Sequence, residues 1–319
     1  MSSLDKPVVL FGGGGFLGRQ VAQDLLGRGY RIRIAQRDVR ATQAIRSLGN
    51  MGQTQFVAVD ITKADRVAAV LAGAGAAVNL VGLLKGNMQA AHVTGARNIA
   101  EAAAATGLEA LVHVSAIGAD PASPSAYGRT KGEGEAAVRA AFPKATILRP
   151  SILFGRDDGF TNRFAQLIAM GSALPFHVVP LIRGEARFQP IHVGDVGEAI
   201  ARAIDDPARF GGATYELGGP DVMTLAQINH WIAGQIGRKA NFLPLPDGLA
   251  STLATLTGWA PGAPITRDQY RMLLKDTVVA PDAKGIDAFG IRPAPMAALV
   301  PAWLTQYRRQ GRFSSPAST

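Results

Sequence analysis

The chain has 319 residues, 47% of them hydrophobic and 18% charged, which is typical of a globular protein with one large core or two modest ones. It contains no cysteine, which excludes disulfides, thiolate metal sites and cysteine nucleophiles, and its five histidines lack metal-binding spacing, so no metal site is predicted. The net charge of +9 comes from scattered residues, which argues against nucleic-acid binding but fits a solvated basic surface or a docking face for an anionic membrane or a protein.

Strand-like and helix-like segments alternate through the first 150 residues. The pattern predicts strands at residues 7–11, 30–35, 54–59, 76–81, 110–115 and 146–148. It predicts helices between them at residues 16–28, 39–48, 63–71, 88–106 and 126–142. The fold class expected from this alternation is α/β, a Rossmann-type doubly wound parallel sheet with helices on both faces.

After Pro150 the alternation loosens. Helices are predicted at residues 160–170, 193–205, 224–236 and 267–275, with a strand at 188–192. We therefore expect a nucleotide-binding domain at residues 1–155 to which 186–206 return. A smaller, interleaved C-terminal α/β domain is expected at 156–185 and 207–310, with a disordered tail at 311–319. No secretory signal and no stretch of about 20 apolar residues is visible, so we expect a soluble or peripheral protein.

A glycine-rich turn joins the first strand to the first helix. Gly12, Gly15 and Gly18 form G-x-x-G-x-x-G, in which the first glycine permits a tight turn, the second lets backbone amides approach a pyrophosphate and the third lets helix and strand pack closely. The phosphates would then lie at the positive end of the helix. The pattern predicts a dinucleotide site, with cofactor contacts from the turn and the start of the helix at Gly12, Gly14, Gly15, Phe16, Leu17, Gly18 and Arg19.

The end of the second strand indicates which cofactor is bound. An acidic residue there would bond the 2′-hydroxyl of NAD, but the chain has Gln36 and then Arg37. Arg37, joined by Arg19, is placed to face a 2′-phosphate, for which the planar guanidinium is suited. The sequence therefore favours NADPH (NADP). Asp38 lies one or two positions late, so NAD stays an alternative.

Further cofactor contacts are predicted where other strands end, because ligands lie at the carboxyl ends of parallel strands. Asp60 and Ile61 follow the third strand and would border the adenine. Residues 79–82 follow the fourth, where Leu80, Val81 and Gly82 would flank the adenine-side ribose. Ser115, Pro150 and Ile152, after the fifth and sixth strands, are also predicted contacts, together with Tyr127 and Lys131.

Tyr127 and Lys131 form Y-x-x-x-K on a predicted helix, where residues four apart share a face. The lysine ammonium would lower the pKa of the phenol and bond the nicotinamide ribose. The tyrosine could then pass a proton while a hydride moves between nicotinamide and substrate. Ser115 is the third, weaker catalytic candidate.

Several stretches together resemble the extended and atypical short-chain dehydrogenase/reductase superfamily, which includes the NAD-dependent epimerases and dehydratases. They are FGGGGFLGR from Phe11, YGRTKGEGE from Tyr127, LRPSILFGRDDGF from Leu148 and RFQPIHVGDVGEAI from Arg187. Within it, VNLVGLL, PSILFGRDDGFTNRFA and TRDQYRMLLKDTVV look most like the NADPH-binding accessory subunit of respiratory complex I, NADH:ubiquinone oxidoreductase, and its bacterial relatives.

This resemblance implies a nucleotide that is held tightly for structure and not turned over. It implies partners among the other subunits of complex I near the quinone-reducing module of this respiratory-chain electron-transport complex. The location implied is peripheral, on the cytoplasmic side of the bacterial inner membrane. The basic charge fits an anionic membrane surface as a further partner.

The chain departs from active relatives after the fifth strand. Those relatives place a Ser or Thr pair there, whose hydroxyl hydrogen-bonds the substrate oxygen. Here Ser115 matches the first member, but Ala116 and Ile117 carry no hydroxyl. Ser123 and Ser125 could substitute, although a loop serine has no particular claim. The departure puts catalysis in doubt while leaving cofactor binding intact.

Three functional hypotheses follow. The favoured one is an NADPH-binding, non-catalytic accessory subunit of complex I. The second is a free NADP-dependent reductase, epimerase or dehydratase acting on a sugar nucleotide or another carbonyl compound, with Tyr127 as the proton donor or acceptor. The third is a redox-sensing regulator that binds NADPH and a protein partner. A shared fold does not decide between them.

Overall fold

The computed structural model describes residues 6–257, 265–309 and 311, so the predicted disordered tail lies outside the described residues except for Gly311. The chain forms two compact units. The first contains residues 1–150, 193–217 and 279–292, and the second contains 151–192, 218–278 and 293–319. The predicted division differs from these units, because 207–217 and 279–292 belong with the first unit and 151–155 and 186–192 with the second.

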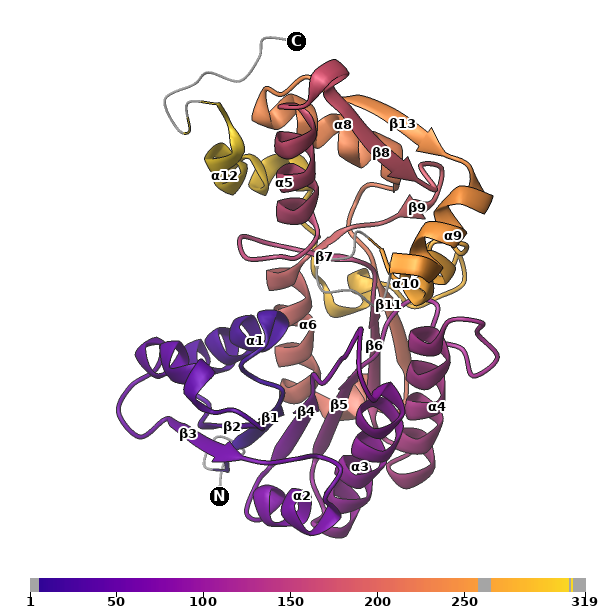
Figure 1. The fold of residues 1–319 in the computed structure, drawn as a ribbon. Coiled ribbons are helices and arrows are strands. Elements are labelled where there is room, and N and C mark those ends of the chain that lie inside the picture. The colour runs from indigo at the N-terminus through magenta and orange to yellow at the C-terminus, as the bar shows by residue number, and fades with distance from the viewer. Residues whose placement is uncertain (1–5, 258–264, 310, 312–319) are drawn as a thin grey trace. The chain divides into compact units, whose positions relative to one another are not determined.

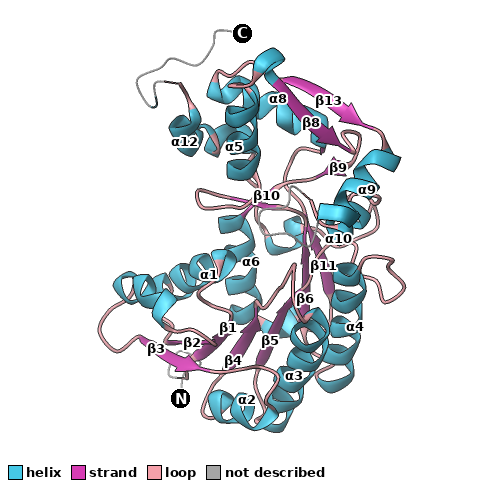
Figure 2. Ribbon diagram, viewed as in Figure 1, coloured by secondary structure: helices cyan, strands magenta, loops and turns pink. Residues whose placement is uncertain are grey.

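A seven-stranded parallel sheet forms the centre of the first unit (Figures 1 and 2), which confirms the predicted fold class. The strand order is β11-β6-β5-β4-β1-β2-β3. The strands are β1 (Val8–Phe11), β2 (Ile32–Gln36), β3 (Thr54–Ala58), β4 (Ala76–Asn79), β5 (Ala110–Val114), β6 (Thr146–Pro150) and β11 (Thr214–Leu217). The order reverses between β1 and β4, and in such sheets the ligand crevice opens at that point, at the carboxyl ends of the strands.

Helices cover both faces of this sheet (Figure 1). They are α1 (Phe16–Gly27), η2 (Arg40–Leu48), α2 (Ala64–Leu71), η3 (Ala90–Thr94), α3 (Gly95–Ala105), α4 (Ala126–Ala141), α6 (Val193–Asp205), α7 (Pro207–Phe210) and η5 (Ile286–Phe289). One face packs against α2, α3 and α4 through fully buried side chains such as Val67, Ile99 and Val138. Helices α1 and α6 pack together on the other face.

Two details of this unit differ from the sequence prediction. The segment 214–217 was not predicted as a strand, yet β11 pairs with β6 and extends the sheet. Its Tyr215 contacts Phe289, which also stacks on Phe210 with ring centroids 4.5 Å apart, so an aromatic cluster ties residues 279–292 to this unit. The predicted helix at 88–106 is present, but residues 90–94 form a π-helical turn, η3, that continues into α3.

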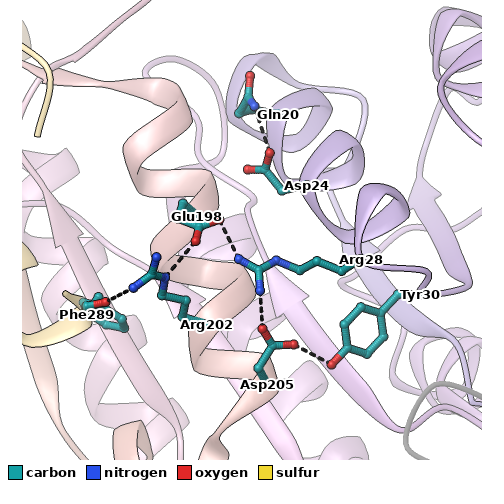
Figure 3. Close-up of polar contacts among 8 residues, drawn as sticks. All are labelled: Gln20, Asp24, Arg28, Tyr30, Glu198, Arg202, Asp205 and Phe289. Atoms are coloured by element: carbon teal, nitrogen blue, oxygen red, sulfur yellow. Dashed lines mark hydrogen bonds and ion pairs between the residues drawn. The ribbon is translucent and has the colours of Figure 1, made fainter. Parts of the chain in front are cut away.

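A charged network joins α1 to α6 (Figure 3). Arg28 bonds Glu198 at 2.6 Å and Asp205 at 2.5 Å, and Tyr30 donates to Asp205 at 2.7 Å. Asp24 accepts from Gln20 through one oxygen, while its buried Oδ2 has no partner among the described residues. The helix that begins at the glycine turn is therefore anchored to its neighbour by polar as well as apolar contacts.

The second unit is built from short elements around a core of its own. The predicted strand at 188–192 is divided, because Gln189 and Pro190 separate β9 from β10. The strands are β7 (Leu153–Phe154), β8 (Val178–Ile182), β9 (Arg187–Phe188), β10 (Ile191–His192), β12 (Met223–Thr224) and β13 (Asn241–Leu245). The helices are α5 (Thr161–Gly171), η4 (Pro175–His177), α8 (Leu225–Ile236), α9 (Asp247–Thr257), α10 (Arg267–Met272), α11 (Met296–Leu299), α12 (Pro301–Leu304) and η6 (Thr305–Tyr307).

Helix α5 packs against both α8 and β8, and Ile168, Ile228 and Leu181 are buried in the core that these elements share. Asp158 fixes the start of α5 by accepting from the Thr161 amide and hydroxyl. Across the described part of the chain, no helix combines the length and hydropathy that a membrane crossing requires.

Candidate nucleotide-binding site

The glycine turn lies at the carboxyl end of β1, beside the point where the strand order reverses. Gly12 has a φ of +77°, a conformation that suits glycine, and its amide donates to the Ala35 carbonyl of β2 at 2.9 Å. A Cβ on Gly12 would meet Val81 at 3.3 Å, because the loop after β4 passes close to the turn. The turn is thus fixed between the two strands that flank β1.

Steric crowding explains two further glycines. A Cβ on Gly18 would lie 2.5–2.6 Å from the backbone of Gly13, so only glycine lets α1 begin this close to the turn. A Cβ on Gly14 would lie 2.3 Å from Thr42 and 2.4 Å from the Gln36 amide oxygen. That oxygen accepts a hydrogen bond from the Gly14 amide at 2.9 Å. The turn is a cradle that small residues keep open.

Helix α1 begins at Phe16 with Gly15 at its N-cap, and glycine has no side chain that could cap the helix. The first turn also carries no acidic residue. The amides of Phe16, Leu17 and Gly18 are those that an α-helix leaves without intrahelical partners, and the helix dipole makes this end positive. An uncapped N-terminus beside a glycine cradle fits the pyrophosphate of a dinucleotide.

The end of β2 carries the predicted 2′-phosphate ligands. Arg37 follows the strand and is exposed. Hydrogen bonds from Thr62 are the main cause that lowers the pKa of Asp60, and the charge of Arg37 contributes to the same shift. Arg19 is exposed on the first turn of α1. Gln36 also bonds the Asp38 carbonyl, so its amide links the glycine turn to the loop after β2.

The predicted adenine-side residues follow β3 and β4. Asp60 is exposed, whereas Ile61 is buried and packs against Gly95 of α3. Leu80 and Val81 are partly buried and Gly82 is exposed. Leu80 continues the sheet register by donating to the Phe11 carbonyl at 2.9 Å.

Two buried polar side chains, Asn79 and His92, hold the loop after β4 by hydrogen bonds to its backbone. Asn79 accepts from the Val81 amide at 3.1 Å and directs its own amide nitrogen at His113. Buried His92 accepts from the Leu83 amide at 2.8 Å through Nε2, so its Nδ1 carries the hydrogen and donates to Thr130 at 2.8 Å. Burial, assisted by the Lys131 charge, lowers the pKa of His92 to about 3, which keeps it neutral. Isolated histidines give no sequence signal for such a role.

Lys131 is buried under this loop. Its ammonium donates to the Val114 carbonyl at 2.9 Å and to the Val81 carbonyl at 3.2 Å. Burial lowers its pKa to about 8, against the smaller raising effect of Glu135. The lysine therefore bridges the ends of β4 and β5.

Tyr127 lies one turn before Lys131 on α4, with its ring edge-on to His92 at 5.5 Å between centroids. Burial raises the pKa of Tyr127 to about 12. The expectation that Lys131 lowers this pKa was wrong for the structure as it stands, because the cost of burying a phenolate dominates.

Ser115 follows β5, and its buried Oγ has no hydrogen-bond partner among the described residues. Such a group normally has a partner, so Ser115 fits a site that a ligand completes. Ser125 instead caps α4 by accepting from the Gly128 amide at 3.2 Å, and Ser123 accepts from the Ser125 amide at 3.3 Å. Both loop serines therefore have local backbone roles.

The last two predicted contacts fall in different units. Pro150 is the last residue of β6 in the first unit. Ile152 belongs to the second unit, where it packs against the core of that unit.

A Rossmann-type sheet, a glycine cradle at the topological switch point and a Tyr–Lys pair on α4 define an α/β protein of the short-chain dehydrogenase/reductase type. The NAD dependent epimerase/dehydratase family matches residues 8–218, and the chain belongs to this family.

Three relatives show what the chain is similar to. NADH dehydrogenase (ubiquinone) 1 alpha subcomplex subunit 9 of Rattus norvegicus mitochondria is 32% identical over 295 residues, which cover 90% of this chain and 76% of the relative. The mitochondrial NADH-ubiquinone oxidoreductase 40 kDa subunit of Neurospora crassa is 27% identical over 97% of this chain and 82% of its own length. Ceramide reductase of Caulobacter vibrioides is 30% identical over 79% of this chain and 78% of its own length.

Solved structures share the fold. The NADPH-dependent quinone oxidoreductase of Escherichia coli, complexed with NADPH, has a TM-score of 0.72 at 19% identity and covers 91% of this chain and 97% of its own. The enzyme WbmG of Bordetella bronchiseptica, in complex with NAD, has a TM-score of 0.69 at 14% identity, covering 95% and 93%. Neighbours of this fold therefore bind either nucleotide, and likeness at this identity shows the fold alone.

Proposed function

We propose that the chain is an accessory subunit of respiratory complex I that binds NADPH as a structural, non-catalytic cofactor. The observation that carries the proposal is the similarity to complex I subunits along nearly the whole chain, second unit included. These two matches cover 90% and 97% of this chain, whereas the match to ceramide reductase covers 79%.

The geometry of the first unit supports nucleotide binding. Gly14 and Gly18 keep the cradle open, the uncapped start of α1 would face the pyrophosphate, and the buried Ser115 hydroxyl lacks a protein partner. Exposed Arg37 and Arg19 would meet a 2′-phosphate, and β2 ends in a neutral Gln36 where an NAD site has a carboxylate. These features together favour NADPH over NAD.

The same geometry supports a non-catalytic role. A nicotinamide cofactor supplies hydride transfer when a substrate oxygen is held beside it. Here Ala116 and Ile117 offer no hydroxyl to hold that oxygen. Tyr127 has a pKa near 12, and the Lys131 ammonium is directed at two backbone carbonyls. A bound nucleotide would instead stabilise the fold by mass action, by about 2.7 kcal/mol at a hundred times its dissociation constant.

A second candidate function is a free NADP-dependent reductase, epimerase or dehydratase. The observation in its favour is that Tyr127 and Lys131 share a face of α4 beside the ends of β4 and β5. The similarity to ceramide reductase gives it weight as well. Turnover of NADPH with a carbonyl substrate, abolished in Tyr127→Phe, would establish it.

We place the partners of the chain among the complex I subunits near the quinone-reducing module, on the cytoplasmic side of a bacterial inner membrane. An affinity-tagged copy, expressed at its native level and extracted in mild detergent, should bring the complex I subunits down in fixed proportion. Recovery of the tagged chain without any of them would overturn the proposal.

A further inference from the structure

One end of the second unit exposes a group of large apolar side chains. Leu167 and Met170 are three residues apart on α5, so they share one face near its end, and Leu174 follows the helix in extended backbone. Met170 is 61% exposed and Leu174 57%. Phe176 in η4 is 82% exposed, and Leu243 on β13 is 55% exposed. We call Met170, Leu174, Phe176 and Leu243 the apolar tip.

The backbone holds the most exposed of these side chains in a costly conformation. Phe176 has a φ of 62° and His177 a φ of 52°, the left-handed region that bulky residues rarely adopt. Asn241 fixes the turn by donating from its side chain to the Phe176 carbonyl. Phe176 therefore occupies a position where glycine would be less strained, although most of the Phe176 side chain is exposed.

Topology gathers the ends of two helices at this tip. Helix α5 leads through η4 into β8, and α8 leads into β13. These two strands are parallel, with Val178 opposite Asn241, so both helices end on the side where the strands begin (Figure 1). Lys239 is two residues before Asn241 and is exposed.

The segments that carry the apolar tip and its neighbouring helices have basic but no acidic residues. Among the described residues, 159–182, 222–246 and 293–309 contain no Asp or Glu. Arg238 donates to the Tyr307 carbonyl and Arg308 to the Gln235 carbonyl, which brings the C-terminal arginines to the end of α8. Arg309 follows and is exposed.

We infer that the apolar tip is a docking surface for an anionic lipid bilayer. Exposed Phe, Leu and Met side chains can enter the headgroup–acyl boundary, while neighbouring Lys and Arg side chains meet lipid phosphates. Because these segments carry basic but no acidic side chains, their charge is complementary to an extended negative surface, which attracts all of the cations together. The inference deepens the proposed peripheral location and rests on it only for its biological setting.

The test uses the purified full chain and vesicles of phosphatidylcholine with or without phosphatidylglycerol. We expect co-sedimentation with the anionic vesicles that weakens as salt increases. Phe176→Gly should weaken this binding about tenfold, through lost apolar burial, while leaving the melting temperature unchanged or raised, because glycine relieves the left-handed strain. A variant that is more stable but binds less separates docking from folding.

Lys239→Glu with Arg309→Glu should weaken binding by at least tenfold, since it removes two attractions to the anionic surface and adds two repulsions. The matched control is Arg66→Glu with Lys144→Glu, which changes the net charge equally on exposed residues of the first unit. Met51→Ser, at another exposed apolar residue of the first unit, controls for Phe176.

Equal binding by variants and controls would overturn the inference, as would no binding to anionic vesicles. If the chain does not co-sediment with anionic vesicles but Phe176→Gly releases it from purified complex I, the tip is a protein contact and the lipid assignment is wrong. Because the vesicle experiment uses the chain alone, its failure leaves membership of complex I to be judged separately by co-purification.

Discussion

The glycine turn of the first unit and the apolar tip of the second both use left-handed backbone, but in opposite ways. At the turn, Gly12 adopts its φ of +77° at little cost, and the absent side chains open a cradle. At the tip, Phe176 adopts a φ of 62° against its preference, and its ring remains exposed. At the turn, where a pyrophosphate is expected to bind, glycine suits the left-handed backbone. At the tip, where a lipid surface is expected to bind, phenylalanine does not. The conflict marks the tip as a surface retained for contact at some expense of stability.

The largest effect should come from filling the cradle. Gly18→Ala places a methyl group 2.5–2.6 Å from the Gly13 backbone, so α1 or the turn must shift. We expect a loss of about 3 kcal/mol in the free energy of unfolding, measured by chemical denaturation, and loss of NADPH binding by calorimetry. Gly27→Ala is the matched control, because nothing lies within 4 Å of its added methyl group on the same helix. Equal effects of the two changes would contradict the close packing described for the turn.

The next largest effect concerns cofactor choice. Arg37→Glu removes a charge-assisted hydrogen bond to the proposed 2′-phosphate and adds repulsion, so the Kd for NADPH should rise about 100-fold. The Kd for NADH should change less than about threefold. Titration of both nucleotides, with Arg31→Glu as an exposed control before β2, measures the difference. Equal weakening of both would refute the 2′-phosphate assignment.

A smaller effect tests the support beneath the turn. Burial, with a further contribution from Glu198, raises the pKa of Asp24 from 3.8 to about 6. Between these pH values the native carboxyl holds a proton that the unfolded chain releases, so this group lowers stability as pH rises from 4 to 6. Asp24→Asn removes the ionisation and should be more stable at pH 7 by roughly 1 kcal/mol, discounted for partial exposure.

The advantage of Asp24→Asn should vanish below pH 4, which denaturation curves across pH will show. Asp65→Asn, at an exposed carboxylate of α2, is the control and should leave the curve unchanged. A variant that is less stable than the wild type at pH 7 would contradict the account of the α1–α6 contact.

The smallest effect is expected at Tyr127. If the cofactor is structural, Tyr127→Phe removes only one hydroxyl from a preformed site, and the Kd for NADPH should change less than about threefold. Oxidation of bound NADPH in the presence of carbonyl substrates should stay at background for both proteins. Wild-type turnover that the substitution abolishes would favour the enzymatic alternative.

Much of the first unit could be predicted from the sequence because periodicity reports burial. The first six strands were predicted because short apolar segments alternate with helix-like segments, and the glycine turn was predicted because a glycine cluster joins the first strand to the first helix. Strand β11 was missed because four residues, Thr214–Leu217, carry little pattern, and its place depends on pairing with β6. The second unit was predicted less well, since its strands have two to five residues and are set by tertiary contacts.

The candidate site divides in the same way. Glycines, Arg37 and the Tyr127–Lys131 spacing stand out in the sequence, and they remain predictions of nucleotide contact. The support from His92 and Asn79 could not be predicted, because both hold the loop through hydrogen bonds to its backbone amides, which a side-chain pattern does not reveal. The raised pKa of Tyr127 also depends on burial, which spacing does not reveal.

The most direct test of the central claim is the composition of complex I purified from the native membranes. The account predicts that the complex contains this chain and NADPH in equal amounts, and that complex from a strain lacking the gene contains neither. NADPH should also be missing from complex that carries Arg37→Glu. A purified, active complex I without this chain would contradict the claim, and an equally large NADPH content in the deletion strain would contradict the assignment of the cofactor to it.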